Sequence, residues 1–238
     1  MHALAQLEIA PRYCGPPGSG NGGYVAGLLA GFSAEPMEVR LRVPPPLSVP
    51  LAVVARGEGF ELTRGDSVIA TATPATVDFA VPPAVPFAAA AAAAAEYRGF
   101  RQHVFPRCFV CGPGRAAGDG LRVFPGALSH AGQSLVAAPW LPDASLIGTR
   151  GRVRPEFLWA VLDCPGYFAV TPEARVMLLA SFACRIEAEV ELGEQCVVAG
   201  WRLGGAGRKH QAATVLYGAD GAPRARALAT WIELRPDA

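Results

Sequence analysis

Two apolar segments in opposite halves of the chain carry residue types suited to polarising a carbonyl group and removing a proton. The first predicted helix opens with Gly22-Gly23, and the second begins at Pro155 and carries Asp163 eight positions later. When Gly22 is aligned with Pro155, Asp163 falls on Ala30. The pattern indicates diverged repeats in which one copy kept accessible backbone amides and the other kept an acid. We therefore expect one active site shared by the two repeats.

The amides at the first helix start can stabilise negative charge. The first N–H groups of a helix have no partner within the helix, and the helix dipole favours an anion there. Because Gly22 and Gly23 have no Cβ, a substrate can approach these amides closely. Asn21 either caps the helix or donates its side-chain amide to the same oxygen. A glycine pair is also typical of close packing or of a turn after a flexible loop, and this alternative stays open.

Asp163 lies in a helix that is otherwise apolar, where an aspartate costs helix propensity and, if buried, desolvation energy. Burial would raise its pKa and so strengthen it as a base. The alternative is a carboxylate that faces solvent or caps a local break, because Pro165 two residues later predicts a kink just after the acid. Pro155 has no N–H to donate and Ala30 has no acid, so the second, pseudo-symmetric site is expected to be inactive.

A Cys-x-x-Cys pair is the other motif with possible chemistry. Cys108 and Cys111 form half of a zinc site, and His103 is a possible third ligand, but no second pair follows at zinc-finger spacing. We interpret the pair as a structural knuckle and expect neither a metal nor another cofactor. Cys164 follows the acid directly, and we interpret it as a small buried residue rather than a nucleophile because no histidine is near it in sequence.

Composition narrows the class of protein. The chain has 238 residues, and its net charge of +1 gives no electrostatic field for nucleic acid, so we expect a small-molecule ligand. The longest apolar run, residues 88–95, is too short to cross a membrane, for which roughly 20 residues are needed. The start lacks the features of a signal peptide, and the six cysteines are expected to be reduced, so we expect a cytoplasmic protein.

The elements that must position these residues follow the same plan in each half. An apolar helix, residues 22–32 or about 155–170, comes before a run of strands whose side chains alternate with period two, as in antiparallel sheets with one buried face. Asp220-Gly221 predicts a hairpin turn between the last two strands. The predicted strands lie near residues 12–14 and at 39–43, 51–55, 60–62, 67–78, 132–137, 176–190, 195–203, 211–217 and 224–233.

An alanine-rich segment separates the halves. Its composition favours a connecting helix, with a flexible tether as the alternative. The sequence thus predicts an α+β protein with an N-terminal repeat at 1–82, a linker helix at 83–100 and a C-terminal repeat at 101–238. A helix that is apolar on nearly every side must be wrapped by its sheet.

With its motifs and elements in this order, the chain resembles the double hotdog thioesterases, in which two hotdog repeats are fused in one polypeptide. They are relatives of the acyl-CoA thioesterases of the phenylacetate-pathway and acyl-CoA thioesterase II types. The resemblance covers both halves and rests on Gly22-Gly23, Asp163 and the late hairpin at Asp220-Gly221. It implies hydrolysis of an acyl-CoA thioester without a cofactor, with Gly22 and Gly23 polarising the carbonyl, Asn21 assisting, and Asp163 as general base or nucleophile.

The resemblance also implies residues that bind the substrate. Tyr24 and Tyr167 lie on or beside the two helices, and Arg208-Lys209-His210 could meet the phosphates of coenzyme A, although a solvated hairpin turn is the alternative there. The competing functions are an acyl-CoA or lipid-binding hotdog without catalysis, an enoyl-thioester hydratase or dehydratase, and a zinc-dependent interaction protein. A fused pair can be a monomer, whereas exposed sheet edges favour a homodimer.

Overall fold

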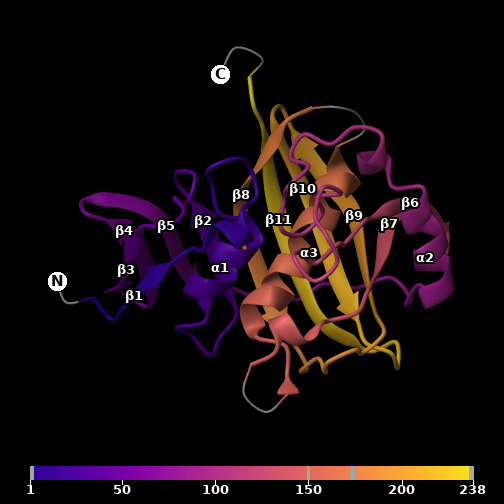
Figure 1. Cartoon of the computed structure of the whole chain (residues 1–238), viewed down its shortest axis with the longest axis horizontal. Coiled ribbons are helices and arrows are strands. Elements are labelled where there is room, and N and C mark those ends of the chain that lie inside the picture. The colour runs from indigo at the N-terminus through magenta and orange to yellow at the C-terminus, as the bar shows by residue number, and fades with distance from the viewer. Residues whose placement is uncertain (1–2, 149–150, 172–174, 236–238) are drawn as a thin grey trace.

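The computed structural model describes residues 3–148, 151–171 and 175–235. Within them the strands pair into one antiparallel sheet, in the order β1-β3-β4-β5-β2-β8-β11-β10-β9-β7-β6 (Figure 1). The strands are β1 (Ala5–Glu8), β2 (Met37–Leu41), β3 (Pro50–Arg56), β4 (Gly59–Arg64), β5 (Ser67–Pro74), β6 (Gly126–His130), β7 (Gln133–Trp140), β8 (Met177–Ile186), β9 (Cys196–Ala206), β10 (Lys209–Tyr217) and β11 (Pro223–Glu233).

The sheet is made of two runs that meet between β2 and β8. Strands β1 to β5 form one run and β6 to β11 form the other. At the junction Val39 lies opposite Phe182, and both side chains are buried. Each run packs against one apolar helix, α1 (Gly22–Ala30) in the first half and α3 (Pro155–Val170) in the second. One sheet made of two runs of strands, each packed against its own helix, confirms the predicted α+β architecture.

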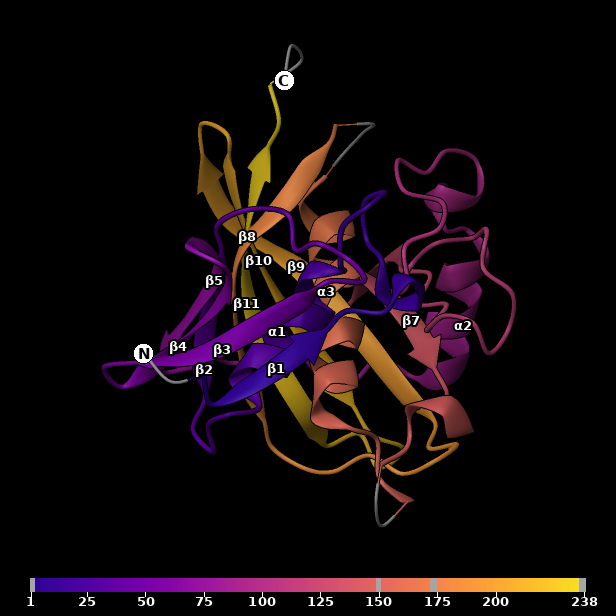
Figure 2. The same ribbon diagram turned by 60° about the vertical axis from the view of Figure 1, so that its left-hand side comes forward.

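The two helices lie side by side against the sheet, in front of its strands in Figure 1 (see also Figure 2), which explains why neither has a polar face. In α1 the side chains of Val25, Ala26 and Leu29 are buried. This helix ends at Ala30, two residues before its predicted end. In α3 the helix passes through Pro165 without interruption, and the loss of that N–H is confined to one position in a segment buried on all sides.

Two glycines allow α1 to pass unusually close to α3. A Cβ on Gly23 would lie 2.6 Å from the Cβ of Asp163 and 2.9 Å from the backbone oxygen of Trp159. A Cβ on Gly27 would lie 2.7 Å from the Cα of Glu156. These glycines are four positions apart and so lie on one face of α1. The crossing brings Asp163 against the N-terminal end of α1.

The alanine-rich segment forms a helix, α2 (Phe87–Ala95), as predicted from its composition, but the helix is shorter than the predicted 83–100 because it starts only after Pro86 and ends before the 3-10 turn at Arg98–Phe100. It packs on the opposite face of the sheet from α3. Neighbouring residues of β10 show this, because Ala212 belongs to the core around α3 whereas Ala213 belongs to the core around Ala90 of α2. Successive side chains of a strand point to opposite faces, so the two helices sandwich this part of the sheet.

The structure differs from the sequence prediction at the start of the chain. The segment predicted as a strand at residues 12–14 contains a short 3-10 helix, Pro11–Tyr13, while the first strand is β1. Pro11 explains the difference, since its fixed φ suits the first position of a helical turn. Strand β6 was not predicted. Other 3-10 turns in the described residues are Arg98–Phe100 and Ala144–Leu146. No helix in the described residues is both long and apolar enough to span a membrane.

Candidate functional site

Asn21 is the residue that organises the N-terminal end of α1. Its Oδ1 accepts a hydrogen bond from the backbone N–H of Tyr24 at 2.9 Å, which is an N-cap. Because Oδ1 is used by the cap, the amide nitrogen faces the other way and donates to Oδ2 of Asp163 at 2.8 Å. The side chain of Asn21 is buried. Its orientation is therefore fixed by both ends of the amide.

Asp163 is buried, with 2% of its surface exposed. Its Oδ2 also accepts the backbone N–H of Gly23 at 3.0 Å, so two donors from the first half hold an acid from the second half. Its Oδ1 is buried and has no hydrogen-bond partner among the described residues. Burial raises the pKa of Asp163 to about 7, although the hydrogen bonds from Gly23 and Asn21 act in the opposite direction. The alternative of a solvent-facing acid is thereby excluded.

The predicted site residues Asn21, Gly22, Gly23 and Asp163 therefore come together. Their hydrogen bonds differ from the predicted roles at one point, because the N–H of Gly23 is bonded to the acid. The N–H of Gly22 makes no hydrogen bond within the described residues. The role of each amide toward a substrate stays a prediction.

A cavity of about 730 Å³ lies beside Asp163 and is lined by residues of both halves. Gly22 and Asn21 line it from the first half, and Asp163 and Tyr167 line it from α3. Much of the remaining wall is apolar. Its apolar side chains include Leu41, Val43, Phe168, Met177, Leu179, Trp231 and Ile232. A mostly apolar cavity with a few converging polar groups is the usual form of a small-molecule site.

Three arginines line this cavity, and sequence reasoning missed all of them. Arg42 follows β2, and Arg98 and Arg101 lie directly after α2. Arg42 and Arg101 are exposed, whereas Arg98 is half-buried with its guanidinium 4.9 Å from the centre of the Phe168 ring. Little in the sequence indicates a binding role for Arg98 and Arg101, because they follow an alanine-rich segment that was interpreted only as a linker.

Four of the predicted substrate-binding residues do not line the cavity. Tyr24 is buried in an aromatic cluster, with its ring 4.2 Å from that of Tyr13. Arg208, Lys209 and His210 lie on the hairpin between β9 and β10, where Arg208 donates to the backbone oxygen of Glu233. Only Tyr167 of the predicted set lines the cavity, and its hydroxyl donates to the backbone oxygen of Arg175 at 2.8 Å.

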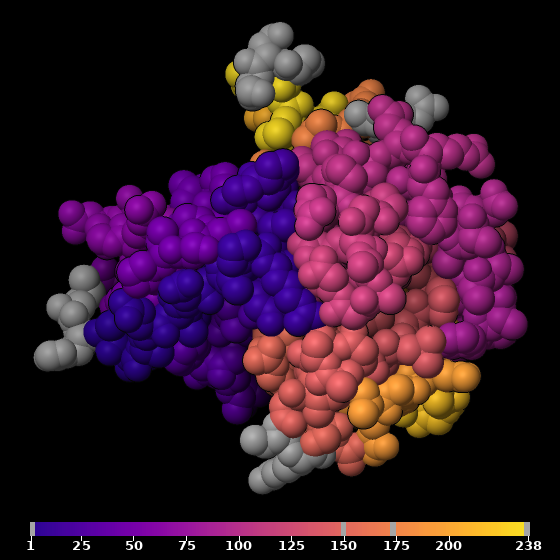
Figure 3. Space-filling model, viewed as in Figure 1, coloured from indigo at the N-terminus to yellow at the C-terminus, as the bar shows by residue number. Residues whose placement is uncertain are grey.

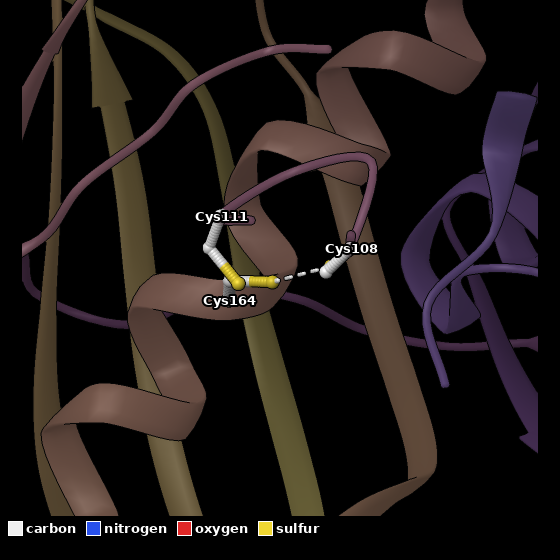
Figure 4. Close-up of side chains that lie close together, drawn as sticks. All are labelled: Cys108, Cys111 and Cys164. Carbon is white, nitrogen blue, oxygen red and sulfur yellow. Dashed lines mark hydrogen bonds between the residues drawn. The ribbon is translucent and has the colours of Figure 1, made fainter. Parts of the chain in front are cut away.

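Three buried cysteines gather at the same cavity (Figure 4). The sulfur atoms of Cys108, Cys111 and Cys164 lie within 4.8 Å of one another, and those of Cys108 and Cys164 are 3.8 Å apart. Hydrogen bonds from the thiols of Cys111 and Cys164, and from backbone amides of Cys111 and Val110, hold the pKa of the Cys108 thiol well below its ordinary value. The predicted pair thus has a third thiol, supplied by the residue after the acid.

The loop that carries two of these cysteines, residues 101–125, is called here the cysteine loop. Its surface lies directly beside that of the N-terminal half in the space-filling view (Figure 3). The N–H of Phe109 donates to the backbone oxygen of Cys14 at 2.7 Å. The buried guanidinium of Arg115 donates to the backbone oxygen of Arg107 at 2.8 Å and to the sulfur of Cys14 at 3.1 Å. These contacts fix the loop over the site.

No protein-family model and no curated protein sequence matches the chain. Solved structures do match it over nearly its whole length. The tesB protein of Mycobacterium avium subsp. paratuberculosis has a TM-score of 0.63 at 11% identity, over 98% of this chain and 96% of that one. A putative oleoyl thioesterase from Lactobacillus plantarum has a TM-score of 0.58 at 10% identity, over 97% and 96%. A protein of unknown function from Alicyclobacillus acidocaldarius, described as having a hot dog fold, has a TM-score of 0.52 at 11% identity, over 97% and 93%.

The fold is a double hotdog. This confirms the architecture that the two helix starts predicted. In the double hotdog, α1 and α3 are the central helices of the two repeats, and they begin at Gly22 and Pro155, the two positions aligned from the sequence. The likeness to these structures establishes the fold, so the chemistry must be argued from the residues around Asp163.

Proposed function

We propose that this double hotdog hydrolyses an acyl-CoA thioester to a free acid and CoA. The observation that supports this most is the carboxylate of Asp163, which is held through Oδ2 by two donors and leaves Oδ1 without a partner beside a cavity. A buried oxygen without a hydrogen bond costs about 1–3 kcal/mol, so it needs a compensating role. A water molecule or the thioester carbonyl carbon would supply that role.

In this proposal the amides at the start of α1 have different tasks. The N–H of Gly23 and the amide of Asn21 hold the carboxylate in one orientation. Gly22 lines the cavity, and its N–H has no hydrogen-bond partner among the described residues and lies at the positive end of the helix dipole. It is the donor we assign to the carbonyl oxygen, which becomes negatively charged when the carbonyl carbon is attacked.

Two routes are open to Asp163. As a general base it takes a proton from water while the oxygen of that water adds to the carbonyl carbon, after which the carbon–sulfur bond breaks and the thiolate of CoA leaves. As a nucleophile it adds directly, expels the thiolate and forms an anhydride that water then hydrolyses. Incorporation of ¹⁸O from labelled water into Asp163 during a single turnover would distinguish the second route from the first.

The cavity can accommodate both ends of such a substrate. Arg42, Arg98 and Arg101 supply positive charge for the phosphates of CoA, and the exposure of Arg42 and Arg101 suits the entrance. The apolar wall, which includes Met177 and Leu179, suits an acyl chain. The putative oleoyl thioesterase has a name consistent with a fatty-acyl thioester substrate.

One observation favours a second function, acyl-CoA binding without hydrolysis. Because the N–H of Gly23 is already bonded to Asp163, only one amide of the pair is free to stabilise the negative charge on the carbonyl oxygen. Loss of one such donor costs typically about 10²–10³ in turnover. Direct measurement of turnover separates the two functions.

The test measures CoA formation from a panel of acyl-CoAs of different chain length, by chromatography. Thiol-reactive dyes are unsuitable because the protein has six cysteines of its own. We expect CoA release by the wild type and release at least about 100-fold slower by Asp163→Asn. The matched control is Asp78→Asn, an exposed aspartate outside the cavity, which should be as active as the wild type. Binding of acyl-CoA without release of CoA across the panel would replace hydrolysis with the second function.

A further inference from the structure

We infer that Cys108, Cys111 and Cys164 form a zinc site with three thiolate ligands. The cysteine loop supplies two of the sulfurs and α3 supplies the third, and all three residues line the cavity (Figure 4). In a tetrahedral site with Zn–S bonds of about 2.3 Å, two sulfur ligands are about 3.8 Å apart. The sulfurs of Cys108 and Cys164 are 3.8 Å apart in the structure. This pair already has the spacing of two zinc ligands, and the sulfur of Cys111 lies within 4.8 Å of both.

His103 is placed to support a sulfur and not to bind the metal. Its Nδ1 accepts the backbone N–H of Phe105 at 2.9 Å, so in the neutral ring the proton is on Nε2. That nitrogen lies 3.4 Å from the sulfur of Cys111 and donates to it. A ligating histidine normally has the reverse arrangement, with the nitrogen remote from the metal donating its proton.

Asn21 provides a second donor to the sulfur cluster. Its amide nitrogen lies 3.9 Å from the sulfur of Cys108 and also donates to Asp163, so its two protons are shared between the thiol and the acid. Donors around thiolate ligands offset the negative charge that three sulfurs place in a buried site. His103 donates to the sulfur of Cys111 from the second half of the chain, and Asn21 donates to the sulfur of Cys108 from the first half.

The other buried cysteines show that burial alone does not produce this environment. Cys184 and Cys196 are buried in strands, and the described residues make no hydrogen bond to either sulfur. The cluster differs in having three thiols in contact, two side-chain donors and access to a cavity. Thiolates are preferred ligands of Zn²⁺, and each thiol that binds the metal releases its proton to solvent.

The site has three protein ligands, and all three residues line the cavity. Zinc sites with four protein ligands are structural, whereas sites with three keep a position for water or substrate. Bound zinc would tie the cysteine loop to α3 next to Asp163. This inference concerns the thiols alone and holds whether or not the protein hydrolyses thioesters.

The test is metal binding by the full chain. The protein is reduced, freed of metal with a chelator and titrated with Zn²⁺ in competition with a chromophoric chelator, and a parallel sample is titrated with Co²⁺. We expect one equivalent of either metal and a sulfur-to-cobalt charge-transfer band in the near ultraviolet. Absence of that band in the wild type would overturn the inference. Failure of the fully reduced protein to take up either metal would overturn it as well.

Variants assign the ligands. Cys164→Ser should lose the charge-transfer band or weaken zinc binding by at least tenfold, whereas the matched control Cys184→Ser should bind like the wild type. His103→Gln should keep one equivalent of Co²⁺ with about 10–100-fold weaker affinity, as for an outer partner of a ligand. Circular dichroism establishes that each variant is folded. Wild-type affinity in Cys164→Ser, or complete loss of binding in folded His103→Gln, would contradict the three-thiolate site.

Discussion

Alanine substitutions at the two adjacent glycines of α1 should have different effects, because the glycines meet different neighbours. A Cβ at Gly23 meets the Cβ of Asp163 at 2.6 Å and a backbone oxygen at 2.9 Å, neither of which can rotate away. A Cβ at Gly22 meets a terminal methyl carbon of Leu179 at 2.9 Å and one of Leu41 at 3.0 Å. These methyl groups can move by rotation of their side chains.

The magnitudes follow from these contacts. Overpacking a tight helix crossing costs about 1–3 kcal/mol, and the better helix propensity of alanine returns at most about 1 kcal/mol. Gly23→Ala should therefore lower the free energy of unfolding by about 1–2 kcal/mol. Gly22→Ala should change it by less than about 0.5 kcal/mol, because the gain in propensity offsets a small repacking cost.

Equilibrium unfolding in urea measures both variants, with the slope m compared to ensure that the same transition is observed. In the acyl-CoA assay, Gly22→Ala should remain folded and lose turnover, because its new methyl group lies beside the amide assigned to the carbonyl oxygen. Equal stability of the two variants would refute the close helix crossing. Full turnover by Gly22→Ala would refute the role assigned to its amide.

Three further substitutions test other parts of the structure. Asp163→Ala should be less stable than Asp163→Asn by about 2 kcal/mol or more in urea unfolding, because it leaves two buried donors unpaired at about 1–3 kcal/mol each; equal stability would contradict the hydrogen bonds at Oδ2. Gly27→Ala should lower the free energy of unfolding by about 1–2 kcal/mol, because its Cβ would meet the backbone of Glu156 and the gain in helix propensity offsets only part of that cost; an unchanged midpoint would contradict that contact. Arg98→Gln should raise KM for an acyl-CoA at least fivefold and leave the rate with a short acyl thioester lacking the nucleotide unchanged; equal loss with both substrates would contradict a role in phosphate binding.

The sequence predicted those parts of the fold that depend on local patterns, namely the starts of the two central helices and the strands with alternating side chains. Gly22, Pro155 and Asp163 are placed in the structure where their alignment implied, because a fused repeat preserves the positions at which its central helices begin. The alanine-rich helix was predicted from propensity, but the face of the sheet that it covers was not. That choice depends on which side chains of β6 and β7 project toward it, and the sequence alone does not show how those strands are placed. The boundaries of the repeats stay a prediction.

The candidate site was predictable only in part, because the remainder depends on contacts between distant segments. Strands β6 and β7 lie between Cys111 and Cys164 in the sequence. Nothing local indicates that the cysteine loop folds back onto α3. The bond from Gly23 to the acid likewise depends on the close helix crossing. Arg208 illustrates the opposite error, since the basic turn that carries it was predicted to bind substrate but Arg208 does not line the cavity and donates to the backbone oxygen of Glu233.

The most direct test of the central claim is the rate of CoA release by Asp163→Asn. This substitution keeps an acceptor for Gly23 and Asn21 and removes only the charge and the ability to accept a proton or attack the carbonyl carbon. The account predicts a folded protein that binds acyl-CoA and releases CoA at least about 100-fold more slowly than the wild type, within the usual contribution of a general base. Turnover equal to that of the wild type, measured on folded protein, would contradict it.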